Sequence, residues 1–414
     1  MDLKQQIRLL AERSRDASRE LAKFDADKKN ALLRAMANGI EKSAAAIQSA
    51  NAKDLDAGKK AGLSSAMLDR LTLTDKRILE MAKGVREVAA LPDPVGTTIS
   101  EWTRPNGIRI RKVRVPIGVI LIIYESRPNV TADAGCLCFK TGNAVILRGG
   151  SEAIHSNLAI AEAMTVPGLP PNSITVVPTT DRAAIDELLK LDDLINLCIP
   201  RGGEGLIRAV AEKSRIPVIK HYKGVCHVYV DRDADFDMAE KIVINAKCQR
   251  PGVCNAIETL LIDEKIADKF LPRIAKALTE HKVELRGDDR TRKLVSNASV
   301  AAEADWYAEY LDLILAVRVV NGVDEAIDHI TKYGSAHSDA IVTGDKATAE
   351  TFLREVDSSS VFWNASTRLA DGAQYGFGAE IGISTDKIHA RGPMGLEELT
   401  SYKFVVVGDG QVRE

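Results

Sequence analysis

Residues 117–131 read IGVILIIYESRPNVT, and this stretch decides the fold class. Its apolar run, 117–124, is too short to span a bilayer, and a polar loop separates it from a helix that starts near Thr131. Further short apolar runs, each separated from the next by a helical pattern, follow at 144–147, 174–177, 194–199 and 217–219. Strands that alternate with helices in this way predict an α/β fold with a parallel, doubly wound sheet. Such sheets bind ligands at the carboxyl ends of their strands.

Apolar residues spaced three and four apart predict helices over Leu3–Leu21, 27–49, 74–89, 151–164, 181–190 and from Gly205 onward. Thr74 is expected to cap the third of these helices. A second α/β region contains a predicted helix at 235–247 and predicted strands at 258–262 and 313–320, and a last strand is expected at 401–407. Because no repeat or low-complexity linker divides the chain, we expect its domains to interleave in sequence.

The chain has 414 residues, enough for two or three domains, and a formal net charge of -2. This charge gives no electrostatic reason to expect nucleic acid or an anionic membrane as a partner. The six cysteines are scattered without a CxxC pair, so neither a disulfide framework nor a metal site is predicted. The start, MDLKQQIRLL, is amphipathic and lacks the apolar core of a signal peptide. We therefore expect a cytoplasmic protein that keeps its thiols reduced.

A β-hairpin is expected around Pro105-Asn106-Gly107, between Trp102 and the segment 108–110. Asn-Gly between two extended segments is the strongest short-range indication of a hairpin. The arms are strongly basic, with Arg109, Arg111, Lys112 and Arg114. Two interpretations stay open: a ribbon solvated on both faces, or a ribbon that pairs with another subunit.

A glycine-rich turn, PRGGEG at 200–205, joins a predicted strand to a predicted helix. Gly202, Gly203 and Gly205 would let backbone N–H groups and the helix N-terminus approach a pyrophosphate. The turn does not match GxGxxG, and a strand–glycine–helix junction is also common as a tight turn. Taken alone, it leaves both interpretations open.

Two polar loops hold candidate reactive groups. Cys254 lies in QRPGVCNAIETLL (249–261), a Pro/Gly loop that leads into a strand, and nearby Arg250 favours the thiolate. Most intracellular cysteines are small buried hydrophobes, and Cys248 fits that description as a packed helix residue. Asn129 follows the strand 117–124, where its amide could donate to an oxyanion or merely cap the next helix.

These segments together resemble the aldehyde dehydrogenase superfamily, and most closely one branch of it, the gamma-glutamyl phosphate reductases. The motifs that carry the resemblance are YESRPNVTADA, LRGGSEA, IPRGGEGLI, QRPGVCNAIETLL, GSAHSDAI and RGPMGLEELTSYK, spread over essentially the whole chain. The resemblance implies an aldehyde-dehydrogenase-like α/β fold with two doubly wound parallel-sheet domains and a small β oligomerisation ribbon. It implies an NADP-binding domain at 1–96 and 117–232, a catalytic domain at 233–390, and oligomerisation segments at 97–116 and 391–414.

The resemblance also implies the chemistry. Cys254 would attack L-glutamyl 5-phosphate, with Asn129 and the Cys254 backbone N–H as the oxyanion hole, and NADPH would reduce the thioester to L-glutamate 5-semialdehyde. This is a step of L-proline biosynthesis. Residues expected to contact the substrate or its phosphate are Arg127, Arg250, His221, His337 and Ser338, although the two arginines could equally form structural ion pairs.

Departures from the family pattern refine these expectations. NAD-preferring relatives place a lysine and, three residues later, a glutamate at the adenosine ribose; here Arg148 and Ser151 stand at those positions, which favours NADP(H). Glu152, one residue further, weighs against this preference. The resemblance adds Gly202, Gly203, Gly205 and Asp312 to the cofactor contacts.

His221 stands 33 residues before Cys254, where hydrolytic relatives keep a glutamate that activates water. His221 could also be a core histidine, and either interpretation leaves no carboxylate base. Two other functions stay open: an aldehyde oxidoreductase that is hydrolytic or uses coenzyme A, and a non-catalytic NADP-binding protein. A homodimer or homotetramer is expected, and the sequence does not settle whether glutamate 5-kinase is a partner.

Overall fold

The computed structural model describes residues 1–413, and the chain divides into two compact units. The first unit holds Met1–Lys220, Gly376–Gly382 and the C-terminal segment from Met394 onward. The second holds His221–Tyr375 and Ile383–Pro393. The units therefore interleave in sequence as expected.

The first unit is built on a four-stranded parallel sheet in the order β5-β4-β3-β6. Its strands are β3 (Val119–Tyr124), β4 (Ala144–Arg148), β5 (Ile174–Val176) and β6 (Leu197–Arg201). Every residue of β3 and β4 is buried, as the continuous apolar runs predict. The predicted strand 217–219 is wrong, because that segment makes only an isolated bridge from Val218 to Cys198.

The helices of the first unit are α1 (Leu3–Leu21), α2 (Ala26–Lys42), α3 (Ala44–Lys60), α4 (Ser65–Leu71), α5 (Asp75–Ala90), α6 (Val130–Lys140), α7 (Ile154–Ala163), α8 (Ala183–Leu188) and α9 (Glu204–Lys213). A 3-10 turn, η1 (Ser151–Ala153), precedes α7. Helix α1 matches its predicted bounds, and Thr74 caps α5 by accepting from the Arg77 N–H. The single helix predicted at 27–49 is wrong, because the backbone leaves the helical conformation at Ser43 and divides it into α2 and α3.

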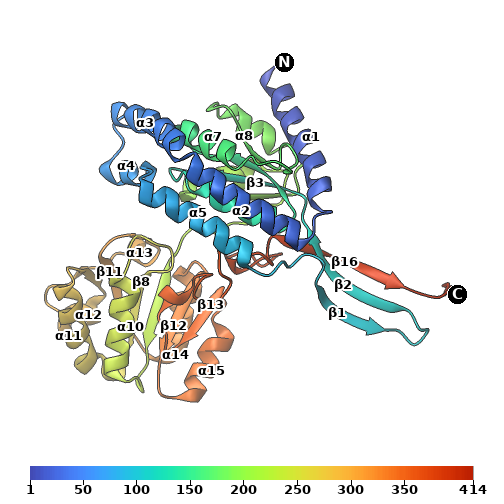
Figure 1. Ribbon diagram of the computed structural model, residues 1–414. Helices are drawn as coiled ribbons and strands as arrows, with labels where there is room; N and C mark the ends of the chain where they lie inside the picture. The colour runs from blue at the N-terminus through green and yellow to red at the C-terminus, as the bar shows by residue number, and fades with distance from the viewer. Residues whose placement is uncertain (414) are drawn as a thin grey trace. The chain divides into compact units, whose positions relative to one another are not determined.

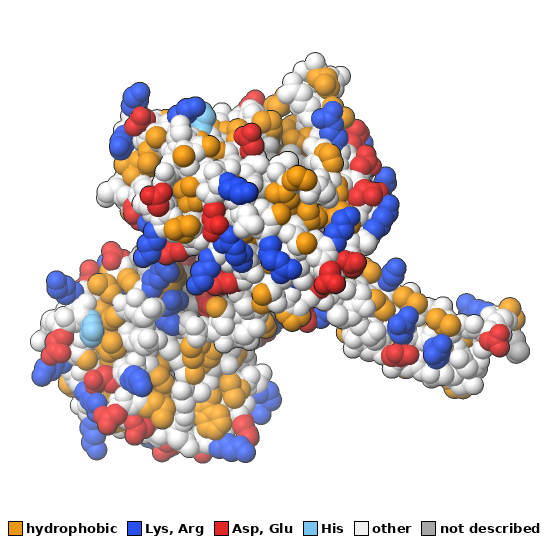
Figure 2. Space-filling model, in the orientation of Figure 1, with side chains coloured by type: hydrophobic (Ala, Val, Ile, Leu, Met, Phe, Trp, Pro, Cys, Tyr) orange, Lys and Arg blue, Asp and Glu red, His pale blue; other side chains and the backbone are white. Residues whose placement is uncertain are grey.

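A three-stranded antiparallel ribbon extends from the first unit (Figure 1). It consists of β1 (Thr98–Thr103), β2 (Arg109–Pro116) and the C-terminal β16 (Thr400–Val407), with β2 in the middle. Hydrophobic and basic side chains lie together along it (Figure 2). Trp102 and Phe404 are exposed and their rings meet edge-on at 6.2 Å. The predicted hairpin is confirmed, and it presents an exposed apolar surface of the kind that usually contacts a partner.

The second unit is built on a seven-stranded parallel sheet in the order β10-β9-β11-β8-β7-β12-β13. Its strands are β7 (Cys226–Val230), β8 (Ile257–Asp263), β9 (Glu284–Gly287), β10 (Ser299–Val300), β11 (Ile314–Val320), β12 (Ser338–Val342) and β13 (Ser360–Trp363). Its helices are α10 (Phe236–Cys248), α11 (Glu264–Glu280), α12 (Asp289–Leu294), α13 (Glu303–Trp306), α14 (Gly322–Tyr333) and α15 (Lys346–Glu355), with a 3-10 turn, η2 (Thr367–Leu369). Two short strands, β14 (Gly382–Ser384) and β15 (Gly392–Met394), pair with each other.

Neighbouring residues of the central strands belong to two separate apolar cores. Val228 and Leu260 pack with the helices α10 and α11. Tyr229 and Leu261 pack instead with α14 and α15. Both faces of the sheet are therefore covered by helices, as a doubly wound sheet requires. The expected boundary after residue 232 is wrong, since β7 lies between β8 and β12 in this sheet and the second unit begins at His221.

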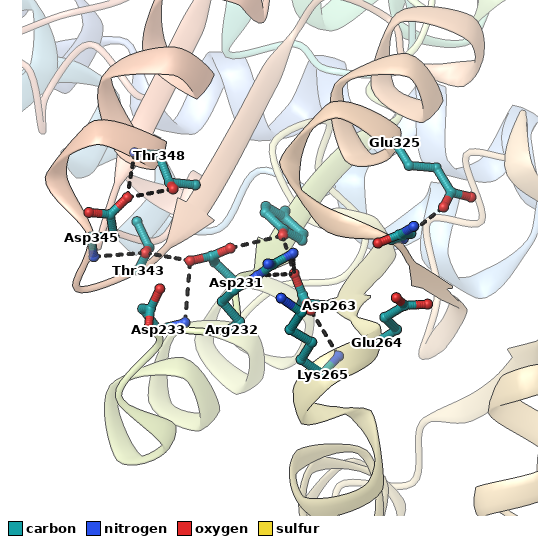
Figure 3. A network of polar contacts seen from close by, with 12 residues as sticks. Asp231, Arg232, Asp233, Asp263, Glu264, Lys265, Glu325, Thr343, Asp345 and Thr348 are labelled. Carbon is teal, nitrogen blue, oxygen red and sulfur yellow. Dashed lines mark hydrogen bonds and ion pairs between the residues drawn. The ribbon is translucent and has the colours of Figure 1, made fainter.

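Polar side chains close the carboxyl edge of the second sheet (Figure 3). Contacts run from Thr348 to Asp345, to Thr343 and on to the buried Asp231 (Figure 3). Asp263, at the end of β8, accepts from Tyr229 and Arg232 and caps α11. The Asp231 and Asp263 carboxylates at the carboxyl ends of β7 and β8 thus have their hydrogen-bond partners within the protein.

We expect the ribbon to hold subunits together, because the aromatic side chains exposed along it form an apolar surface of the kind that marks a protein–protein contact. Replacing Trp102 and Phe404 by serine should shift the protein toward monomer in sedimentation velocity. Leu79→Ser is the control, since Leu79 is equally exposed on α5 of the same unit but lies outside the ribbon. A monomeric intact protein at micromolar concentration would contradict the expectation.

Candidate active site

Cys254 is one of two cysteines that are accessible in this structure. Cys136, Cys138, Cys198 and Cys226 are buried, and burial raises the pKa of each of these thiols well above its ordinary value. Cys248, the last residue of α10, is half-buried, and burial raises its pKa as well. Cys254 is half-buried in the loop between α10 and β8, at the amino edge of the second sheet. Cys254 is therefore the only one of the six cysteines that lies in a loop and is also accessible to a substrate.

The segment leading into β7 lies directly against the Cys254 backbone. A Cβ atom on Gly224 would stand 2.0 Å from the Cys254 carbonyl oxygen, so only glycine fits there. The Cys226 thiol donates to that same carbonyl at 3.2 Å. The Gly224 N–H donates to Glu309 Oε1 at 2.8 Å, which fixes the segment from its other side. These contacts hold the backbone of the candidate nucleophile in place.

His221, His337 and Ser338 gather beside this contact. His337 Nδ1 lies 3.7 Å from Cys226 Sγ and 2.9 Å from Ser338 Oγ, and the rings of His221 and His337 meet edge-on at 5.8 Å. His337 and Ser338 are fully buried and expose no surface to a substrate in this structure. Their expected role as direct substrate contacts therefore has no support here. His337 instead packs against the Cys226 thiol, and Ser338 in turn contacts His337, so the two residues help to position Cys226.

A buried ion pair connects the two elements that flank the Cys254 loop. Lys247 Nζ, in the last turn of α10, lies 2.6 Å from Glu258 Oε2 of β8, and both side chains are fully buried. Burial raises the pKa of Glu258 to about 7, against the opposing effect of Lys247. Burial likewise lowers the pKa of Lys247. The pair joins helix and strand on either side of the loop.

Arg368 also contacts the Cys254 loop, although no sequence motif indicated this residue. Its Nε donates to Gln249 Oε1 at 2.9 Å and its Nη1 donates to Asn255 Oδ1. An arginine is a common ligand of phosphate, but Arg368 lies 119 positions from Gln249, so no local sequence pattern connects the two residues. Arg250, which was predicted, is exposed in the same loop.

Asn129 lies in the first unit, directly before α6, where its side chain makes no capping hydrogen bond. Its Nδ2 donates to Asp133 Oδ2 at 2.9 Å, and its side chain is exposed at the carboxyl edge of the sheet. The capping role is thus not supported. Ser126, at φ 46°, holds the preceding turn by donating from its N–H and hydroxyl to Glu152 Oε1. Arg127 is exposed in the same turn.

A cavity of about 610 Å³ opens at the carboxyl edge of the first sheet, within the range typical of cofactor sites. Arg148, Ser151, Glu152 and Gly205 line it, as do apolar side chains in or next to α4, α8 and α9. The cavity wall offers an apolar slot beside cationic groups, which fits the adenosine end of a nicotinamide cofactor. The apolar side chains in question are Leu63, Met67, Ile185, Leu189, Leu206 and Val210.

The glycine-rich turn lies at the start of α9, beside this cavity. Gly203 is the N-terminal cap residue of α9, and a Cβ on Gly203 or Gly205 would meet nothing within 4 Å. In this structure the Gly203 N–H donates to Glu125 Oε2 at 3.0 Å, and a Cβ on Gly202 would lie 2.4 Å from the same oxygen. The Glu125 carboxylate therefore already accepts a hydrogen bond at the N-terminus of α9. The pyrophosphate interpretation stays a prediction.

The cations of the cavity differ in what holds them. Arg148 is buried and donates to the carbonyl groups of Gly149 and Thr180, and burial lowers its pKa. Arg182, which sequence reasoning missed, is exposed, and its side chain makes no hydrogen bond or ion pair with any residue in 1–413. Lys213 also lines the cavity but pairs with Asp186 at 2.9 Å. Asp312 lies in the second unit, exposed, and accepts from the Leu313 N–H.

The sequence and fold were compared with known proteins. The aldehyde dehydrogenase family model matches residues 3–312. The gamma-glutamyl phosphate reductases of Geobacter metallireducens and Moorella thermoacetica are 60% and 57% identical, each over 100% of both chains. The chain belongs to the aldehyde dehydrogenase family.

Solved structures support the same assignment. The gamma-glutamyl phosphate reductase of Thermotoga maritima is 47% identical, with a TM-score of 0.97 over 99% of this chain and 100% of that one. An acetylating aldehyde dehydrogenase from Geobacillus thermoglucosidasius, 18% identical with a TM-score of 0.69, shares the fold. The predicted fold class and the prediction of an oxidoreductase of this family are confirmed. None of the helices within residues 1–413 has the length and apolar character needed to cross a bilayer.

Gly224→Ala tests whether the close approach at Cys254 matters. The added methyl would overlap the Cys254 carbonyl and displace the loop, and a misplacement of about 1 Å costs on the order of a hundredfold in turnover. Alkylation of Cys254 by iodoacetamide should also change in rate. Gly84→Ala is the control, because a Cβ there meets nothing within 4 Å. Equal behaviour of the two variants would show that the contact does not position the thiol.

Proposed function

We propose that the chain reduces L-glutamyl 5-phosphate to L-glutamate 5-semialdehyde and phosphate with NADPH, as a step of L-proline biosynthesis. The observation that carries the proposal is the 60% identity over the full length of a gamma-glutamyl phosphate reductase, combined with a half-buried loop cysteine. The proposal places the enzyme in the cytoplasm as a homodimer or homotetramer. Glutamate 5-kinase, which would supply the acyl phosphate, is a candidate partner in that sequence of steps.

In the proposed mechanism, the Cys254 thiolate attacks the acyl carbon of the substrate. The Asn129 amide and the Cys254 N–H donate to the oxygen that becomes negatively charged, and phosphate leaves with the electron pair of the broken carbon–oxygen bond. A thioester on Cys254 results. When bound, the nicotinamide supplies the hydride that reduces this thioester. The second oxyanion then collapses, expels the Cys254 thiolate and releases the aldehyde.

The absence of a carboxylate at position 221 supports reduction rather than hydrolysis. A hydrolytic dehydrogenase needs a base that activates water against the thioester. His221 stands there instead, and its ring faces His337 at 5.8 Å. The proposal assigns His221 no part in activating water.

NADPH is proposed over NADH because the cavity of the first unit carries two guanidinium groups, those of Arg148 and Arg182. Arg148 donates to two carbonyl groups, with Ser151 beside it, and its charge would favour a cofactor that carries a 2′-phosphate. Arg182 keeps all its donors available for a 2′-phosphate. Glu152 opposes NADPH binding less than expected from the sequence, because its Oε1 already accepts two hydrogen bonds from Ser126.

The direct test of the proposal is the reverse reaction, NADP⁺ reduction by glutamate semialdehyde. Turnover should require added phosphate and should not be supported by coenzyme A in its place. Cys254→Ala should abolish it, whereas Cys248→Ala, at the other accessible cysteine, should keep most of it. Rapid turnover in phosphate-free buffer would contradict the proposal and indicate a hydrolytic dehydrogenase.

For the cofactor, Arg182→Ala should weaken NADPH binding much more than NADH binding, and so should Arg148→Ala. The loss of one charged hydrogen-bond partner predicts roughly ten- to a hundredfold. Fluorescence titration of the reduced cofactors measures this without turnover. Lys213→Ala is the matched control, because Lys213 lines the same cavity but is paired with Asp186. Equal weakening of both cofactors would assign the arginines to another part of the ligand.

For the oxyanion, Asn129→Ala should lower kcat by roughly a hundred- to a thousandfold, as the removal of one preorganised donor does. Asp133→Asn keeps a hydrogen-bond acceptor for the Asn129 amide and should cost much less. A loss below about threefold for Asn129→Ala would return Asn129 to a structural role.

A further inference from the structure

The segment around η2 is fastened to the Cys254 loop by a set of hydrogen bonds. Thr367 Oγ1 donates to the Asn255 carbonyl at 2.7 Å, and Asn255 Nδ2 donates to the Ala370 carbonyl at 2.9 Å. Thr367 and Asn255 are both buried. The backbone on each side of Arg368 is therefore fixed relative to the residue that follows Cys254.

Arg368 extends from this anchored backbone across the loop. Its guanidinium donates to Gln249 on one side of Cys254 and to Asn255 on the other. It is half-buried, and each of these partners is a neutral amide oxygen. Within residues 1–413 no carboxylate forms an ion pair with Arg368 or with Arg250. Two cations, Arg250 in the loop of the candidate nucleophile and Arg368 in η2 beside it, thus have no carboxylate bound to them.

This arrangement has an electrostatic cost that an anion would remove. Burial and the charge of Arg250 lower the pKa of Arg368, while Asp371 and the Cys254 thiolate oppose that effect. A desolvated cation next to a like charge is stable only when other interactions compensate. A bound anion would compensate the charges of Arg368 and Arg250 at once. A guanidinium group often forms two parallel hydrogen bonds to two oxygens of one phosphate.

We propose that Arg368, together with Arg250, binds the phosphoryl group of the acyl phosphate beside Cys254. This inference rests on the proposed function and adds to it the residue that holds the leaving group. As Cys254 Sγ bonds to the acyl carbon, the bond from that carbon to the phosphate oxygen breaks. The electron pair leaves with the phosphate, and the two guanidinium groups compensate its growing charge. The alternative is that Arg368 only fastens the loop.

Kinetics of the reverse reaction separate these two roles. Arg368→Gln should raise the KM for inorganic phosphate by roughly ten- to a hundredfold, the effect of losing a charge-assisted contact, and leave the KM for semialdehyde within about threefold. Arg368→Lys should recover part of the loss, because it keeps the charge. Arg354→Gln is the control, since Arg354 pairs with Glu355 at an exposed site of the same unit. A fall in kcat with an unchanged KM for phosphate would overturn the inference.

A second readout does not depend on turnover. Inorganic phosphate should slow the alkylation of Cys254 by iodoacetamide in the wild type and in Arg354→Gln, but not in Arg368→Gln. Protection that persists in Arg368→Gln would assign Arg368 to fastening the loop alone. If Arg368→Gln fails to fold, Arg250→Gln decides, because the Arg250 side chain makes no hydrogen bond that the fold would lose. Unchanged protection by phosphate in Arg250→Gln would then overturn the inference. A wild type that turns over without phosphate would instead contradict the proposed function itself.

Discussion

The position of Cys254 depends on one close contact, in which the segment leading into β7 passes the Cys254 carbonyl at a distance that leaves no room for a Cβ on Gly224. The Cys226 thiol completes the contact by donating to that carbonyl. A buried thiol with a raised pKa stays protonated and so remains a donor at neutral pH. The Cys226 thiol thereby fixes the Cys254 backbone and remains protonated, so it does not act as a second nucleophile. His337 contacts Cys226 and Ser338, and both His337 and Ser338 are buried.

Around this contact, two interactions connect the two ends of the Cys254 loop. The buried pair of Lys247 and Glu258 joins α10 to β8, and removal of one partner from such a pair typically costs about 3–5 kcal/mol because a charge is left uncompensated. Arg368 and Thr367 join the loop to η2. The ends are therefore rigid, while Cys254 and Arg250 between them stay accessible. Such a loop can hold the Cys254 thiol and the arginine side chains in fixed positions while leaving them accessible to a substrate.

Much of the fold could be predicted because it rests on local patterns. The apolar runs of β3 and β4 and the spacing within α1 gave their positions, and Pro251 and Gly252 marked the reactive loop. The break at Ser43 was missed because the buried residues Ile40 and Ile47 keep a helical spacing across it. The approach of Gly224 to the Cys254 carbonyl, and the role of Arg368, depend on contacts between segments that are distant in sequence. No local pattern encodes either of these.

The central claim is that Cys254 carries an acyl group that phosphate, and not water, removes. Intact-protein mass spectrometry of the enzyme mixed with semialdehyde and NADP⁺ in phosphate-free buffer tests it most directly. The account predicts one glutamyl adduct per chain, located on the peptide that contains Cys254, which persists until phosphate is added and then disappears. An adduct on another residue, or an enzyme that clears the adduct equally fast without phosphate, would contradict the account.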